Sequence, residues 1–170
     1  MLIGQAPGVH EGRLGRPFAY TAGKTLFKWL NEATGSDEEN LREIVYFSAV
    51  TRCFPGKAKS GSGDRVPSAD EIANCRVLLS AEIRALRPKL ILAVGRLAIG
   101  EVLGESLFSK DVSLTEVVGR KFKTEIYGID VEVIPLPHSS GVSRWPKTEP
   151  GKTCLRKALK LVQREFLKLA

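Results

Sequence analysis

The stretch KLILAVG, residues 89–95, is an apolar run that closes on a glycine. A strand with one buried face alternates apolar and polar residues, whereas a strand buried on both faces reads as a nearly continuous apolar run. Three other stretches have this character: LIG (2–4), EIVYFSAV (43–50) and VEVIPLP (131–137). The four stretches therefore predict four buried strands of one parallel sheet.

Helical segments separate these strands. Residues 23–33 and 152–169 place apolar side chains at helical spacing, and residues 68–86 begin with Ser68 and Glu71 at the spacing of a capping box. Strand and helix thus alternate along the chain, which is typical of an α/β fold. We expect a three-layer α/β/α sandwich with a central four-stranded parallel sheet.

Length and composition set broad limits. The 170 residues suit one domain, and we expect residues 1–170 to form it. Only GKAKSGSGDRVP, residues 56–67, has the composition of a disordered segment. No apolar run approaches the roughly 18 residues of a membrane span, and the start has no signal-peptide pattern. We therefore expect a soluble, cytoplasmic protein.

The charge indicates a class of partner. Lysine and arginine total 26 residues against 19 aspartates and glutamates, which gives a formal net charge of +7. A basic chain favours a polyanion, above all nucleic acid, because phosphate contacts release counterions. The same charge can also simply keep a protein in solution.

In sheets of this kind, ligands bind beyond the carboxyl ends of the strands. The loop after the first strand, GQAPGVHEGRLGRPF (4–18), has glycines that let the backbone approach a ligand, and it ends on Phe18. An aromatic ring at the rim of a basic pocket can stack on a base, and it can equally cover the helix that follows.

The loop after the last strand begins with His138 and continues with Ser139, Ser140 and Gly141. A histidine directly after a strand can hydrogen-bond to a ligand or transfer a proton, although an isolated histidine is more often structural. The small residues behind it can hold a phosphate through their N–H and O–H groups. Arg144 then brings a cation to the loop tip, where it can reach nucleic acid.

Three common motifs do not occur in the sequence. It has no GxxxxGK[ST] phosphate loop and no GxGxxG after a strand, so nucleotide- and dinucleotide-binding enzymes of those types are not supported. The GxSxG elbow of many hydrolases is missing as well.

The loops, taken in chain order, match a set of family motifs. IGQAPGVHEGRLGRPFAYTAGKTL (3–26) is similar to GEAPGxxE…GRPFxGxAGxxL, and AVTRCFPG…RVPSADEIANC (49–75) is similar to NVVKCRPP…RxPxxxEixxC. KLILAVGRLAI (89–99) resembles the strand and turn that follow, and PLPHSSGVSRW (135–145) takes the place of an HPS motif. Over nearly its whole length the chain resembles the uracil-DNA glycosylase superfamily, and within it most closely the iron–sulfur-type (family 4) branch.

The resemblance implies a monofunctional DNA N-glycosylase of base excision repair, an enzyme that flips uracil or another deaminated base out of DNA and hydrolyses its N-glycosidic bond. The pocket of such an enzyme stabilises negative charge on the departing base while a water attacks the sugar, without a metal. By this resemblance, His138 donates a hydrogen bond to a base carbonyl and Gln5 helps to orient the water. DNA is then the partner, and we expect a monomer without membrane contact.

The same resemblance assigns two further sets of residues. Those of the base pocket are Ala6, Pro7, Gly8, Phe18 and Ala49, with Phe18 stacked on the flipped base. Those against the DNA are Ser139, Ser140, Gly141 and Arg144, the first three at the flanking phosphates.

Some positions depart from the branch's pattern. Gln5 stands where the branch has glutamate, and matches the glutamine of the family 1 enzymes instead. Ala6 has no carboxylate to activate water, as in the branch itself, and Ala49 replaces an asparagine that reads the edge of uracil. Serine replaces the proline after His138.

These departures keep a second hypothesis open, a non-catalytic relative that binds damaged or single-stranded DNA. An enzyme acting on free nucleosides or other small molecules has little support, because the basic charge would then be unused.

The branch also implies an iron–sulfur cluster, which normally takes four cysteine thiolates. Cys53 and Cys75 match the second pair of ligands, whereas the first pair belongs to a CxxC ahead of the first strand. The sequence starts at that strand, and Cys154 lies in the last predicted helix. We therefore expect no cluster and no other metal; the alternative is that these residues are a shortened version of a longer protein.

Overall fold

In the computed structural model, which describes residues 1–59, 61 and 63–168, five strands form one sheet. They are β1 (Leu2–Gly4), β2 (Phe47–Ala49), β3 (Leu90–Val94), β4 (Phe122–Ile126) and β5 (Ile129–Leu136). Their order across the sheet is β2-β1-β3-β5-β4, and all neighbours are parallel except β4 and β5. The predicted α/β fold is confirmed, with one strand more than the predicted four.

The strand that the prediction missed is β4, at the edge of the sheet. Its residues FKTEI alternate between more and less exposed positions, so it has no continuous apolar run. It joins β5 through Tyr127 and Gly128, whose φ angles of 52° and 80° suit a two-residue hairpin turn of type I′. An antiparallel edge strand keeps one face in solvent and so carries polar residues at alternate positions. A criterion of continuous apolar runs does not find such a strand.

The strand predicted at residues 43–50 begins too early. Residues 43 and 44 end helix α3 (Glu38–Ile44), and the pairing in β2 covers only residues 47–49. Asp37 caps this helix, because its side chain accepts a hydrogen bond of 2.9 Å from the backbone N–H of Asn40. Two glutamates in the first turn favour the helix further through its dipole.

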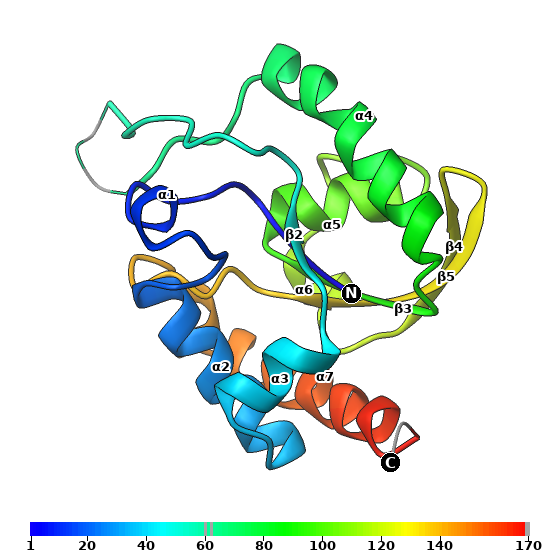
Figure 1. Ribbon diagram of the computed structural model, residues 1–170. Coiled ribbons are helices and arrows are strands. Elements are labelled where there is room, and N and C mark those ends of the chain that lie inside the picture. The colour runs from blue at the N-terminus through cyan, green and yellow to red at the C-terminus, as the bar shows by residue number, and fades with distance from the viewer. Residues whose placement is uncertain (60, 62, 169–170) are drawn as a thin grey trace.

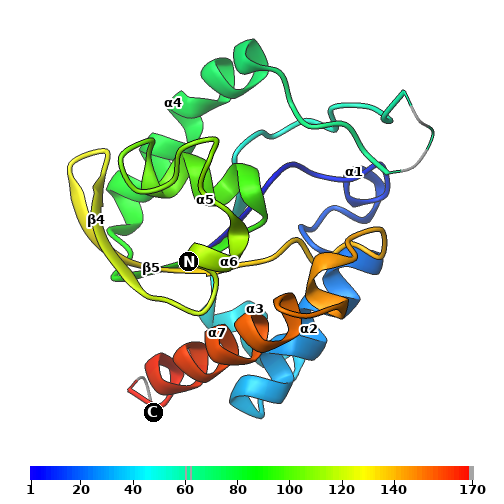
Figure 2. The ribbon, with the colours of Figure 1, turned by 180° about the vertical axis from the view of Figure 1, so that it is seen from behind.

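Helices cover both faces of the sheet, as Figures 1 and 2 show. On one face lie α4 (Ala69–Leu86) and α5 (Arg96–Leu103); on the other lie α2 (Thr21–Thr34), α3 and α7 (Gly151–Phe166). Short turns of helix within the connections are α1 (Glu11–Leu14), α6 (Leu114–Val117) and η1 (Trp145–Lys147). The three predicted helices correspond to α2, α4 and α7; residue 169, the last one predicted for α7, lies outside the described residues.

The capping box predicted at the start of α4 is present. Ser68 Oγ accepts a hydrogen bond of 3.2 Å from the backbone N–H of Glu71, whose carboxylate accepts one of 2.7 Å from the backbone N–H of Ser68. These two bonds satisfy N–H groups that the first helical turn leaves without a partner, which fixes where α4 begins.

In the segment at residues 56–67, described residues from its two halves are bonded to each other. The backbone N–H of Arg65 donates to the carbonyl of Gly56 at 2.9 Å, and Lys57 and Asp64 form both a strand-like bridge and an ion pair of 2.7 Å. The prediction of disorder is therefore wrong for the described residues of this segment; residues 60 and 62 lie outside them.

The core confirms that the parallel strands β1, β3 and β5 are buried on both faces, whereas β2, at an edge of the sheet, is only partly buried at Phe47 and Ala49. Leu2 and Ile3 of β1, Ile91 of β3 and Val133 of β5 are all 0% exposed. Adjacent residues on a strand point to opposite faces, so full burial of Leu2 and Ile3 together requires cover on each side. No helix of the described residues is long and apolar enough to span a membrane.

Candidate active site

A cleft of about 1170 Å³ opens at the carboxyl ends of the parallel strands. Gly4, Ala49 and Val94 line it where β1, β2 and β3 end, and His138 lines it just beyond β5. In Figure 1 the connection after β1, the segment between β2 and α4 and the connection after β5 gather at the same side of the sheet. The site thus lies where a parallel sheet normally places one.

The cleft brings together nearly all the residues predicted for the site. Its lining includes the predicted catalytic and pocket residues Gln5, Ala6, Pro7, Gly8, Phe18, Ala49 and His138, together with Ser139, Ser140 and Gly141. Arg144 is not part of the lining; it is exposed and precedes η1. Positions that are up to 138 residues apart in the chain, Gly4 and Val142, therefore share one cavity.

Phe18 sits directly on the end of β1. A Cβ atom at Gly4 would lie 2.6 Å from Cζ of the Phe18 ring, so the ring occupies the space above that glycine. The ring also meets that of Phe47 edge-on, at 6.1 Å between centroids. Its backbone has a φ of 53°, in the left-handed region that phenylalanine rarely adopts. This placement on the cleft wall favours the stacking hypothesis over that of a cover for α2.

His138 is largely buried and held from two sides. The backbone N–H of Ser140 donates to Nδ1 at 3.1 Å, and a Cβ at Gly95 would lie 2.9 Å from Cδ2. Since Nδ1 accepts a bond, we assign the proton of the neutral ring to Nε2. Burial lowers the pKa of His138 below its usual value, and the Asp64 carboxylate offsets part of that shift. Near neutral pH the ring is therefore an uncharged donor through Nε2.

Gln5 and Ala6 form the first part of the cleft wall after β1. Gln5 Nε2 donates to the carbonyl of Arg65 at 3.5 Å, and the Gln5 carbonyl accepts a bond of 3.2 Å from the backbone of Thr51. These bonds tie the first loop to the segment after β2. Ala6 contributes a methyl group, so it supplies no base that could activate a water.

Sequence reasoning gave no role to two carboxylates near the cleft wall. A Cβ at Gly8 would lie 2.6 Å from Glu11 Oε2 and 3.5 Å from Asp64 Oδ2, and both acids line the cleft. Glu11 was visible in the first motif, whereas Asp64 lies in the segment predicted to be disordered. Its bond to Lys57 is what brings Asp64 to this place.

Two hydroxyl groups in the lining are buried: that of Ser139, which was predicted to lie at the DNA, and that of Thr51, to which sequence reasoning gave no role. Thr51 is 2% exposed and Ser139 is 1% exposed. Neither hydroxyl oxygen has a hydrogen-bond partner among the described residues. Buried polar atoms normally have partners, so these two hydroxyl groups can still form hydrogen bonds in the cleft wall.

Comparison with known proteins identifies the family of this chain. The family model described as the uracil DNA glycosylase superfamily matches residues 1–163. The chain belongs to that superfamily. A type-4 uracil-DNA glycosylase of Saccharolobus solfataricus is 33% identical over 138 residues, which are 81% of this chain and 59% of that protein. One of Archaeoglobus fulgidus is 30% identical over 148 residues, 86% of this chain and 68% of that protein.

A relative of another type is also similar. A type-5 uracil-DNA glycosylase of Pyrobaculum aerophilum is 34% identical over 113 residues, which are 61% of this chain and 47% of that protein. The chain thus spans between about half and two thirds of the length of these relatives. The matches named type-4 confirm the resemblance to the family 4 branch.

The cysteines of this superfamily member do not gather into one group. The backbone N–H of Arg52 donates to Cys75 Sγ at 3.5 Å, so Cys75 lies beside the segment that carries Cys53. Cys154 is buried in α7 and its Sγ contacts the carbonyl of Thr115. No three potential metal ligands come together among the described residues. The two thiols of Cys53 and Cys75 do not by themselves fit a cluster that takes four.

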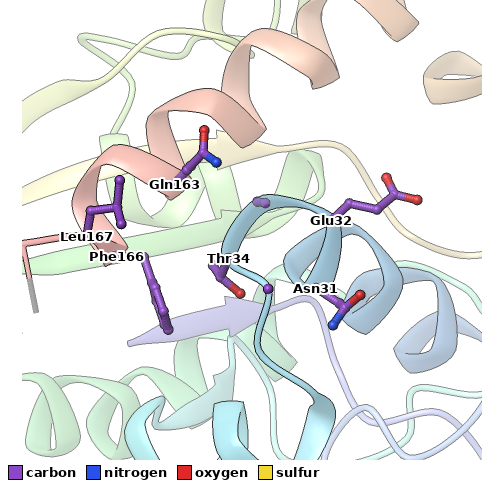
Figure 3. A pocket seen from close by; sticks show the side chains of 8 residues that line it. Asn31, Glu32, Thr34, Gln163, Phe166 and Leu167 are labelled. Carbon is purple, nitrogen blue, oxygen red and sulfur yellow. The ribbon is translucent and has the colours of Figure 1, made fainter. Parts of the chain in front are cut away.

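A second hollow, of about 290 Å³, lies between the carboxyl ends of α2 and α7. Figure 3 shows that the Asn31 and Glu32 side chains point away from the Phe166 ring. A ligand site needs polar groups that converge on a common point, and here they diverge. We therefore assign the function of this glycosylase-superfamily chain to the large cleft.

Proposed function

We propose that this chain is a monofunctional DNA glycosylase of base excision repair, which flips uracil or another deaminated base out of DNA and hydrolyses its N-glycosidic bond. The observation that carries the proposal is the pairing of His138 with Phe18 in one cleft: a neutral ring that donates through Nε2 and an aromatic ring fixed on the end of β1. These are the two groups that a flipped base needs, one for hydrogen bonding and one for stacking.

The reaction follows from these groups. A flipped base stacks on Phe18, and Nε2–H of His138 donates to a carbonyl oxygen of that base. As the bond between the base and the sugar carbon breaks, its electron pair moves onto the base, and the His138 bond strengthens with the growing negative charge. A water adds to the sugar carbon and releases its proton to solvent. A donor that is already placed does not have to reorganise during this step.

Gln5 has the second catalytic role in the proposal. Its amide oxygen can accept a hydrogen bond from the attacking water and so fix the direction of attack. An amide orients a water without removing its proton, so this role fits a reaction in which the bond to the base is nearly broken before the water adds. Ala6, Pro7 and Gly8 form the wall behind it, and Ala49 lies on the neighbouring strand, in register with Gly4.

DNA is the proposed partner. Ser139, Ser140 and Gly141 can bind the phosphates beside the flipped nucleotide, and the exposed Arg144 can contact the strand next to it. The net charge of +7 supports binding to a polyanion. We propose that residues 1–170 act as a single domain and as a monomer in the cytoplasm, with the DNA. No cluster enters the proposal, since Cys53 and Cys75 supply two thiols where a cluster takes four.

One observation favours a second candidate function, a relative that binds damaged DNA without cleaving it. Positions 6 and 49 carry methyl groups, so the cleft has neither a carboxylate at the first position nor an amide at the second. Such a protein would still stack a base on Phe18. It would bind a lesion tightly but would not release the base.

One assay separates the two candidates. Labelled duplexes and single strands with one uracil, hypoxanthine or xanthine, or with no lesion, are incubated with the protein and then treated with alkali. Strand scission at a lesion supports the glycosylase and identifies the base. Tight binding to a lesion without any abasic product contradicts it and supports the binding protein. Visible absorbance of the purified protein, with iron analysis, would contradict the absence of a cluster.

A further inference from the structure

We infer that Arg42 is a positioning residue that locks Phe18 into its stacking position. The inference rests on the proposed function, in which Phe18 stacks on the flipped base. Arg42 lies in α3, outside the cleft lining, and 24 residues beyond Phe18 in the chain. It would therefore act on the base only through Phe18.

The backbone at Phe18 needs such a lock. A non-glycine residue with a φ of 53° is disfavoured, so the turn holds this shape only if other contacts determine it. The turn is also tightly enclosed: a Cβ at Gly23 would clash with the carbonyl group of Phe18, and one at Gly4 would reach its ring. Glycines at positions 4 and 23 leave room for the turn, but they do not bond to it.

The Arg42 guanidinium supplies the bonds. Its Nη1 donates to the carbonyl of Pro17 at 3.0 Å, and its Nη2 donates to that of Phe18 at 3.2 Å. Two successive carbonyls are thus held by one rigid, planar group, which fixes the peptide planes on both sides of Phe18. These two planes determine the direction in which the Phe18 side chain leaves the backbone.

Arg42 is itself fixed on its remaining sides. Its Nε donates to Glu38 Oε1 at 2.9 Å, and its guanidinium carbon lies 4.5 Å from the centre of the Phe27 ring and 5.4 Å from that of Phe47. Its side chain is only 13% exposed. Phe47 in turn contacts the Phe18 ring, so Arg42 supports Phe18 both through the backbone and through packing.

Ion pairs also connect the start of α3 to the residues just before Phe18. Glu38, which binds Arg42, lies 3.8 Å from Arg16, and Arg16 pairs with Glu39 at 3.4 Å. The start of α3 therefore holds both ends of the short segment from residue 16 to residue 18. These exposed pairs contribute little by themselves, whereas the half-buried Arg42 makes the contacts to Phe18 directly.

A double-mutant cycle tests the inference. The variants are Arg42→Met, Arg42→Lys, Phe18→Ala and Phe18→Ala combined with Arg42→Met. Two quantities are measured. One is kcat/KM for base release; the other is the affinity for an oligonucleotide with 2-aminopurine at the lesion position, determined from the quenching of its fluorescence. We expect Arg42→Met to lower both by about tenfold in the original chain and by less than about twofold in the Phe18→Ala background.

Arg42→Lys keeps the charge but cannot hold two carbonyls in one plane, so we expect most of the loss to remain. The matched control is Arg76→Met, which removes a bidentate arginine–glutamate pair between α4 and α5 and leaves the cleft lining intact. Thermal unfolding is measured for each variant. We expect the control to be less stable but to keep its kcat/KM and its affinity for the oligonucleotide.

The outcomes separate this inference from the proposed function. If the losses of Arg42→Met and Phe18→Ala multiply in both readouts, Arg42 does not act through Phe18 and the inference is overturned. It is also overturned if Phe18→Ala changes neither readout. If no lesion is cleaved but the quenching assay shows the coupling, the inference stands and the proposed glycosylase activity fails.

Discussion

The Phe18 ring fills the space that a side chain at Gly4 would occupy, with Cζ at 2.6 Å from the position of the missing Cβ. Position 4 must therefore lack a side chain for the Phe18 ring to lie where it does. Since β1 ends at this position, the ring also forms part of the cleft wall. This single contact joins the sheet to the proposed stacking surface.

Gly4→Ala should displace the ring. The added methyl cannot coexist with Phe18 in its present position, so we expect base release to fall by about tenfold or more and stability to fall by about 1–3 kcal/mol. Single-turnover rates and urea unfolding measure the two effects. Gly100→Ala is the matched control: its Cβ would meet Phe108 at an ordinary 3.7 Å inside α5, so activity should stay unchanged. Equal rates for Gly4→Ala and the control would contradict the placement of Phe18.

The pH dependence should reflect a histidine that resists protonation. Burial lowers the pKa of His138 in the folded chain, so the neutral ring persists below the usual histidine pKa of about 6.5. We expect the rate to hold as pH falls past that value and to drop only below it. Because the unfolded chain binds this proton more readily, the free energy of unfolding decreases as pH falls below about 6.5. NMR titration of the imidazole signals, with His10→Gln for assignment, measures the direction of the His138 pKa shift. A pKa above the usual value would contradict this prediction.

Position 49 should control the choice of base. Residues 47 and 49 lie on the same face of β2, where Phe47 meets Phe18, and Ala49 pairs in register with Gly4 beneath the Phe18 ring. An amide introduced by Ala49→Asn would thus lie beside a stacked base. We expect it to raise the preference for uracil over hypoxanthine by about tenfold, since a hydrogen-bonding group discriminates where a methyl does not. Competition assays on paired substrates measure this ratio, and an unchanged ratio would place the base elsewhere.

Arg144 should contribute to DNA affinity without contributing to base choice. It is exposed and outside the cleft lining, so Arg144→Ala should weaken binding about equally for all lesions and lower the slope of log affinity against log salt by about one. Fluorescence anisotropy over a series of salt concentrations measures both. Arg84→Ala is the control, because this exposed arginine lies in the last turn of α4 and bonds to the carbonyl of Tyr127. The same loss of slope in both variants would contradict a specific role for Arg144.

The parts of the fold that could be predicted are those with a strong local pattern. The fully buried strands read as apolar runs, and the capping box of Ser68 and Glu71 identified the start of α4 correctly. Strand β4 and helix α3 were both missed because the prediction relied on continuous apolar runs. One is half exposed and has no apolar run, and the last two residues of the other, 43 and 44, were included in the predicted strand 43–50.

The site shows the same limit. The predicted residues that line the cleft lie in loops at strand ends, so topology placed these loops together and the family resemblance identified the single residues. The left-handed backbone of Phe18 and the bonds from Arg42 were not predictable, because no local signal connects positions 18 and 42. Asp64 was missed because a composition rich in glycine, serine and lysine concealed a turn that Lys57 and Asp64 close.

The measurement that tests the central claim most directly is base release from uracil-containing DNA by this chain and by its His138→Ala variant. We predict alkali-sensitive abasic sites with the original chain, and a loss of about a hundredfold or more when the Nε2–H donor is removed. Circular dichroism and lesion binding control for the folding of the variant. No abasic product at any lesion with the original chain, or equal rates for the two proteins, would contradict the account.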